Sequence, residues 1–225
     1  MQFPNAYKGI RRIFTAEILT MISGIILLLT LTAGSGMLDE FAAGDMTTVS
    51  GPALALASIS GLASIFALVA FFMNISGISD ASKDEESFKK ALLWLVIGIG
   101  ASLVGSLAVN MNDIIASFAG IISSLCEYMI YYNVVTGIIH LAERLEDERV
   151  NALGQQTIRL LTIVYAVVII VQLVMLVMTA ASGNAAQGTF AVAAVAVSVI
   201  AGIMSMAAYV IYLRVLAGAK KMLER

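Results

Sequence analysis

The chain alternates six long apolar stretches with short polar connections. Each stretch is close to or above the ~20 residues that a helix needs to cross the ~30 Å hydrocarbon core of a bilayer. The stretches are continuously apolar rather than alternating, which argues against a β-barrel, and lipid offers the backbone no hydrogen-bond partners. The pattern predicts an all-α integral membrane protein with a single transmembrane domain over residues 1–225 and spans at about 13–34, 52–75, 91–109, 114–139, 160–181 and 189–213.

Composition agrees with a chain whose solvent is lipid. Hydrophobic residues make up 60% of the 225 residues and charged residues 12%, and the mean hydropathy is +0.95. The net charge of −2 offers no basic surface for nucleic acid, so the expected partner is the lipid bilayer. The single cysteine, Cys126, and the single histidine, His140, are too few for a thiolate or imidazole metal site, and no cofactor is expected.

All thirteen Lys and Arg residues fall on one side of the predicted membrane. They lie before the first span, between the second and third, between the fourth and fifth, and after the sixth: Lys8, Arg11, Arg12, Lys83, Lys89, Lys90, Arg144, Arg149, Arg159, Arg214, Lys220, Lys221 and Arg225. The positive-inside rule makes this side cytoplasmic. Both termini are therefore predicted to lie in the cytoplasm, with the chain in a plasma or inner membrane. The connections are too short to hold a soluble catalytic or nucleotide-binding domain.

Two cytoplasmic segments carry helix-end signals. Ser82 and Glu85 have the spacing of a capping box, which predicts that the third helix begins at Ser82. The mixed charges from His140 to Val150 predict a cytoplasmic extension of the fourth helix whose charged residues face solvent.

The even-numbered spans share a small-Gly-x-x-Ser pattern, at residues 60–64, 119–123 and 201–205. A second glycine follows the glycine of each pattern after 16 or 17 residues, near the predicted cytoplasmic end of the span: Gly77, Gly137 and Gly218. We interpret the chain as three helical hairpins, with a possible internal threefold repeat. The alternative is that small residues recur by chance in membrane helices.

Small residues also recur at four-residue spacing along single spans. Gly98, Ser102 and Ser106 form one such seam. Seams of this kind let helix backbones approach closely in lipid, so we expect a structural role for them.

Glu17 and Glu127 are the two acids inside the spans. Glu17 lies near the cytoplasmic end, where it can reach the interface or pair with a basic residue. Glu127 lies near the bilayer midplane, where a charge costs on the order of 2.5–3.5 kcal/mol on insertion scales. Its side chain is therefore expected to face the bundle interior or a wet cavity.

Helical spacing places Ser124, Glu127 and Tyr131 on one face of the fourth helix, and Tyr165 and Gln172 on one face of the fifth. These five residues form the candidate site. One hypothesis is that Glu127 binds a cation, a proton or the amine of a substrate. The other is that a neutral Glu127 joins two helices by a hydrogen bond to Gln172 or a tyrosine. The remaining tyrosines near the cytoplasmic side, Tyr209 and Tyr212 among them, are expected in part to be interfacial belt residues.

No catalytic motif is found, so an enzyme is not expected. Three hairpins resemble the mitochondrial carriers, although the proline-acid-x-x-base signature of that family is missing. Helix count and size resemble the substrate-binding subunits of energy-coupling-factor vitamin transporters. Residues 7–19 and 78–92 are similar to small bacterial membrane proteins of unassigned function. No functional residue is carried over from these resemblances.

Two functions remain open from the sequence. The first is a small-solute or ion transport component with a mid-membrane polar site around Glu127. The second is a non-catalytic membrane subunit or assembly protein that acts through helix contacts with a partner subunit or with further copies of itself. A cavity beside Glu127 would favour the first, and a filled bundle with an exposed small-residue groove would favour the second.

Overall fold

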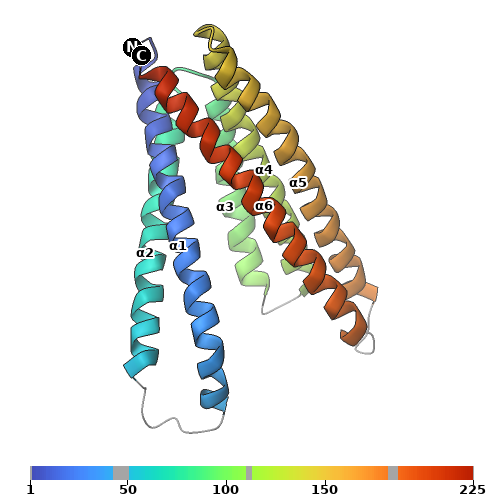
Figure 1. The fold of residues 1–225 in the computed structure, drawn as a ribbon. Helices are drawn as coiled ribbons and strands as arrows, with labels where there is room; N and C mark the ends of the chain where they lie inside the picture. Colours follow the sequence, from blue (N-terminus) through green and yellow to red (C-terminus); the bar gives the residue numbers. More distant parts are fainter. Residues whose placement is uncertain (1, 43–50, 110–112, 182–186, 225) are drawn as a thin grey trace. The chain divides into compact units, whose positions relative to one another are not determined.

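The structure, a computed structural model, describes the backbone of residues 2–42, 51–109, 113–181 and 187–224, and the side chains of residues 2–30, 58–109, 114–177 and 205–224. All regular elements in these ranges are helices (Figure 1). There are six: α1 (Pro4–Ala42), α2 (Gly51–Ala81), α3 (Ser87–Ala108), α4 (Asp113–Arg144), α5 (Glu148–Ala181) and α6 (Gln187–Leu223). The prediction of an all-α chain with six helices is confirmed.

Five of the helices have the length and composition of membrane spans, and their outer faces carry large apolar side chains such as Leu29, Phe72 and Leu107 that are 61%, 61% and 74% exposed. The spans are Pro4–Thr30, Ser58–Ala81, Ser87–Ala108, Ile114–Arg144 and Glu148–Val177. The predicted sixth span, at about 189–213, falls largely on side chains outside the described ranges. The chain is thus a multi-pass helical membrane protein. The hairpin and repeat arrangement stays a prediction.

The described residues fall into two compact units. The smaller unit is residues 11–77, formed by α1 after Ile10 and α2 before Ile78. Glu17 is buried in this unit and accepts a hydrogen bond of 3.1 Å from Asn74 Nδ2. A second link joins Arg12 Nη1 to Ser76 Oγ at 2.8 Å. The acid that the sequence placed near the interface is therefore held by an amide on the neighbouring helix.

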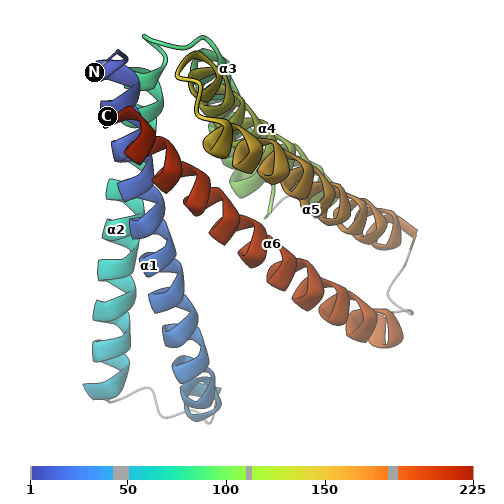
Figure 2. The same cartoon turned by 45° about the horizontal axis from the view of Figure 1, so that its top comes forward.

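The larger unit, residues 1–10 and 78–225, contains α3 to α6. Packing follows chain order: α3 lies on α4, α4 on α5 and α5 on α6 (Figures 1 and 2). The predicted small-residue seam accounts for the first of these contacts. A Cβ built on Gly98 would lie 3.2 Å from Cβ of Cys126, and Ser102 Oγ lies 3.1 Å from Ser123 Oγ. The close approach of α3 and α4 thus depends on the absence of larger side chains.

The core of the larger unit lies at the end where the basic residues gather, which we call the basic end. Asp84, in the turn between α2 and α3, binds the start of α1 through Asn5 Nδ2 at 2.9 Å and the backbone N–H of Ala6 at 2.8 Å. An acid at a helix N-terminus satisfies free N–H groups and the positive end of the helix dipole. Lys8 adds an ion pair of 3.6 Å with Asp80.

The structure corrects the predicted start of the third helix. Helix α2 continues to Ala81, and Ser82 Oγ donates back to the Ser79 carbonyl at 2.7 Å. Helix α3 begins only at Ser87, without a side-chain cap. The capping-box prediction was wrong, because the carboxylate of Glu85 binds partners on another helix instead of capping the start of α3.

Those partners lie at the end of α4. The prediction that this helix extends to Val150 with its charged residues facing solvent is also wrong in part. Helix α4 ends at Arg144, Glu146 adopts a left-handed backbone with φ of 55°, and Asp147 Oδ1 caps α5 by accepting from the Val150 N–H at 3.0 Å. His140 and Arg144 do not simply face solvent. His140 Nδ1 lies 3.0 Å from Glu85 Oε1, and Arg144 Nη2 lies 2.9 Å from Glu85 Oε2.

Burial of the Glu85 carboxyl by itself raises its pKa, but the hydrogen bond from His140 and the charge of Arg144 outweigh burial and hold the pKa below its ordinary value. Nearby, Gly137 leaves room for the ring of Phe88, since a Cβ there would lie 2.6 Å from Phe88 Cε2. The turn between α2 and α3 therefore binds α4 through the charge of Glu85, and the start of α3 packs on α4 through the ring of Phe88.

The substitution Glu85→Gln should lower stability at pH 7 by about 1.5–3 kcal/mol, the usual contribution of a hydrogen bond to a charged group. Because folding lowers the pKa of Glu85, its contribution is present above the ordinary value of 4.5 and is lost as pH falls through the lower folded value. Thermal unfolding followed by circular dichroism should show a wild-type advantage that shrinks in acid. Glu86→Gln, at an exposed neighbouring acid, is the control; an equal loss there, or a difference independent of pH, would contradict the prediction.

Candidate functional site

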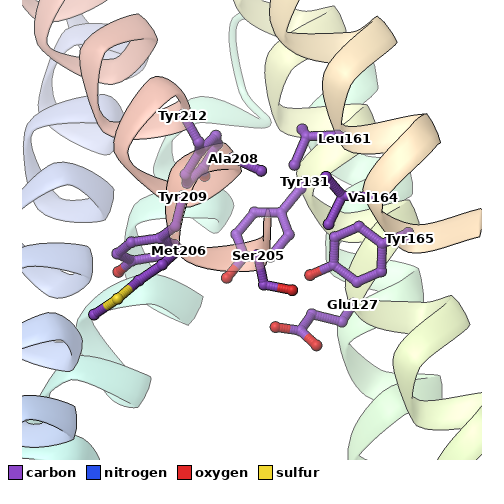
Figure 3. Close-up of a pocket in the computed structure, with 10 residues that line it drawn as sticks. All are labelled: Glu127, Tyr131, Leu161, Val164, Tyr165, Ser205, Met206, Ala208, Tyr209 and Tyr212. Atoms are coloured by element: carbon purple, nitrogen blue, oxygen red, sulfur yellow. The ribbon is translucent and has the colours of Figure 1, made fainter. Parts of the chain in front are cut away.

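A pocket of about 280 Å³ opens between α4, α5 and α6 of the larger unit (Figure 3). Ten of the described residues line it: Glu127, Tyr131, Leu161, Val164, Tyr165, Ser205, Met206, Ala208, Tyr209 and Tyr212. Helical spacing explains the set, because residues three, four and seven apart share a face. The pocket is therefore built by one face from each of three helices.

Among the residues whose side chains are described, Glu127 provides the single carboxylate of this lining, and no Lys, Arg or His side chain is part of it. It lies 14 residues after the start of α4 at Asp113 and 17 before its end at Arg144, which places it roughly 20–25 Å from either end. The Tyr165 hydroxyl acts as a hydrogen-bond partner of the carboxyl. In Figure 3 the polar ends of Glu127, Tyr165 and Ser205 gather on one side of the pocket.

Tyrosine rings form the rest of the polar wall. Tyr131 packs edge-on against Tyr212, with ring centroids 4.7 Å apart and an interplanar angle of 67°. Its centroid also lies 6.3 Å from that of Tyr165, and Tyr209 lies 6.4 Å from Tyr212. Tyr212 is fully buried, so this wall has a fixed base in the core.

The cluster continues outside the pocket. Tyr128 contacts Tyr165 at 5.6 Å and Tyr132 at 5.9 Å between centroids. Six of the seven tyrosines of the chain thus form one continuous series of ring contacts across α4, α5 and α6. This arrangement fixes three helices around one aromatic surface.

The structure brings together three of the five residues that the sequence pointed to: Glu127, Tyr131 and Tyr165 line the same pocket. Ser124 and Gln172 lie outside its lining. They bind each other instead, since Gln172 Nε2 donates to Ser124 Oγ at 2.9 Å. The buried Oε1 of Gln172 has no hydrogen-bond partner within the described part of the chain. This pair joins α4 to α5, and it is Ser124 rather than Glu127 that the Gln172 amide reaches.

The contribution of α6 was missed. Tyr209 and Tyr212 were assigned in part to an interfacial belt, yet with Ser205 they form the third wall of the pocket. Their spacing of four and then three residues on an otherwise apolar helix was the available signal. Sequence alone does not say which face of α6 turns toward α4.

The described residues of this lining offer one carboxylate, the tyrosine and serine hydroxyls, and aromatic rings. Within the described residues, no three His, Cys, Asp or Glu side chains lie close enough to hold a metal ion. The arrangement can bind a small solute, attract positive charge and exchange hydrogen bonds. No protein family, no curated protein and no solved structure matches the chain.

We expect the pocket to admit water. In a Cys126→Ala background, Ser205→Cys should react with a membrane-impermeant, positively charged methanethiosulfonate, because a thiol reacts as its thiolate and that ion forms where water reaches it. The control is Ile163→Cys, at a 56% exposed position of α5 outside the lining, where lipid should prevent reaction. Labelling followed by mass spectrometry measures both. Equal labelling of the two positions, or none at Ser205→Cys, would contradict a water-accessible pocket.

Proposed function

We propose that this protein is a membrane component that binds a small solute for transport, with the ligand held in the pocket between α4, α5 and α6. The observation that carries the proposal is the hollow beside Glu127, lined by tyrosines contributed by three helices. Ligand pockets are typically apolar and aromatic with a few convergent polar groups. The pocket has this character.

The position of Glu127 supports the same conclusion. An acid at mid-depth in a bilayer costs free energy unless it is paired, neutral or hydrated. A purely structural acid would be enclosed by groups from neighbouring helices. Glu127 has a hydrogen-bond partner in Tyr165 of α5, but its carboxyl is also exposed to the pocket, and no basic side chain of the described residues pairs with it. Gln172, the amide that the sequence offered as a structural partner, donates to Ser124 instead.

The alternative role, a subunit that acts through helix contacts, requires small-residue faces that remain available to a partner. The seam containing Gly98 and Ser102 is occupied within the chain by Cys126 and Ser123 of α4. This removes one such face. With this seam on α3 occupied, the pocket beside Glu127 is the observation that favours a solute-binding role.

The proposal includes an orientation. The basic end carries the N-terminal residues, the turn after α2, the turn after α4 and the end of α6, where Gly218 lies beside Val150. By the positive-inside rule this end is cytoplasmic. A fluorescent protein fused to the C-terminus should be fluorescent in bacteria, and an alkaline phosphatase fused there should be inactive. The reverse result would overturn the orientation.

Native mass spectrometry of the protein purified gently from its own membrane tests the function. We expect a monomer or defined oligomer that carries a small, reproducible adduct, which is lost in Glu127→Ala. Glu143→Ala, at an exposed acid near the end of the same helix and outside the pocket, should retain the adduct. Co-purification of a second polypeptide with no small adduct would contradict the proposal and favour the subunit role.

A further inference from the structure

The pocket has the chemistry of a cation site with aromatic walls. We infer that its ligand is a small organic monocation, an amine or a quaternary ammonium compound. Glu127 supplies the counter-charge, and the tyrosine rings supply the walls. This inference rests on the proposed function, since it names the class of solute that the same pocket holds.

The charge of the pocket lining indicates that the ligand carries a positive charge. Among the described residues, the lining contains one carboxylate and no basic side chain, so an anion would meet a like charge with no opposite charge to offset it. A pair of opposite charges attracts strongly where the effective dielectric constant is low, and intramembrane acids commonly serve as counter-ions. A neutral solute would not offset the free-energy cost of a charged Glu127 at mid-depth, because it brings no opposite charge.

The rings decide between an organic and an inorganic cation. A cation within about 6 Å of an aromatic centroid is attracted by the ring face, and quaternary ammonium groups are bound in this way by aromatic cages. Tyr165, Tyr131, Tyr212 and Tyr209 line the pocket as a continuous series of rings, and the centroids of neighbouring rings in this order lie 6.3, 4.7 and 6.4 Å apart. A site for Ca²⁺ uses about 6–8 oxygen ligands and a Mg²⁺ site about six, whereas this lining offers one carboxylate and a few hydroxyl groups.

Size supports the same class. The volume of about 280 Å³ is far more than a bare metal ion requires and is close to the lower end of ligand pockets, which begin at roughly 300 Å³. The apolar lining, which includes Leu161, Val164 and Met206, suits methyl or methylene groups around the charged nitrogen. A strongly hydrated ammonium or sodium ion would gain nothing from these side chains.

The test is equilibrium binding of radiolabelled choline to the purified full-length protein in nanodiscs. Unlabelled tetramethylammonium should compete, and dimethylbutanol, the neutral carbon isostere of choline, should bind at least about tenfold more weakly. Sodium at the same concentration should not compete. Glu127→Gln should weaken choline binding by about tenfold or more, because the isosteric amide removes only the charge.

Two tyrosine variants separate the ring face from the hydroxyl. Tyr131→Phe keeps the face and should change affinity by less than about twofold, whereas Tyr131→Leu should weaken it by about threefold to tenfold. Tyr132→Leu, at a neighbouring tyrosine outside the lining, is the matched control and should bind as wild type. These variants keep the inference open to refutation even if Glu127→Gln fails to fold.

The outcomes distinguish this inference from the proposed function. Equal binding of choline and its neutral isostere, both lost in the pocket variants, would overturn the cation inference and leave a solute pocket in place. Failure of both choline and tetramethylammonium to bind would also overturn it. If native mass spectrometry then still shows an adduct that depends on Glu127, the proposed function survives; if it shows none, both proposals fall.

Discussion

Lipid supplies no hydrogen-bond partners, so each polar group within the spans must find one in the protein or in water that the protein admits. This constraint organises the described structure. Glu17 is met by Asn74 and Gln172 by Ser124, and each pair joins two neighbouring helices. Glu127 also has a partner on a neighbouring helix, Tyr165 of α5, but its carboxyl opens in addition onto a pocket. The fold therefore leaves space beside this acid.

The two ends of the larger unit are held together by different interactions. At the basic end, Asp84 holds the start of α1 and Glu85 holds the end of α4, while side chains such as Leu141 and Leu216 are fully buried. This end is the fixed point from which the helices extend. Farther along the same helices, α4, α5 and α6 meet through tyrosine rings. Ring contacts position three helices without filling the space between them, which is how a stable bundle retains a pocket.

The sequence determined the elements that depend on local pattern. Six apolar stretches of sufficient length predict six helices because lipid permits few alternatives, and Gly98 and Ser102 predict a close helix contact because small side chains permit it. Helical spacing also placed Glu127 and Tyr131 on one face, and Tyr165 on a neighbouring helix. These conclusions require no knowledge of which helices meet.

Only the tertiary structure decided the pairings. Glu85 has the spacing of a cap, yet it binds His140 and Arg144 some 55 to 59 positions later in the chain, because the packing of α4 brings two partners to its buried carboxylate. Gln172 meets Ser124 because the relative rotation of α4 and α5 sets their register. The α6 wall of the pocket depends in the same way on which face of that helix turns inward. A single sequence specifies the faces of each helix, and the packing between helices decides which faces meet.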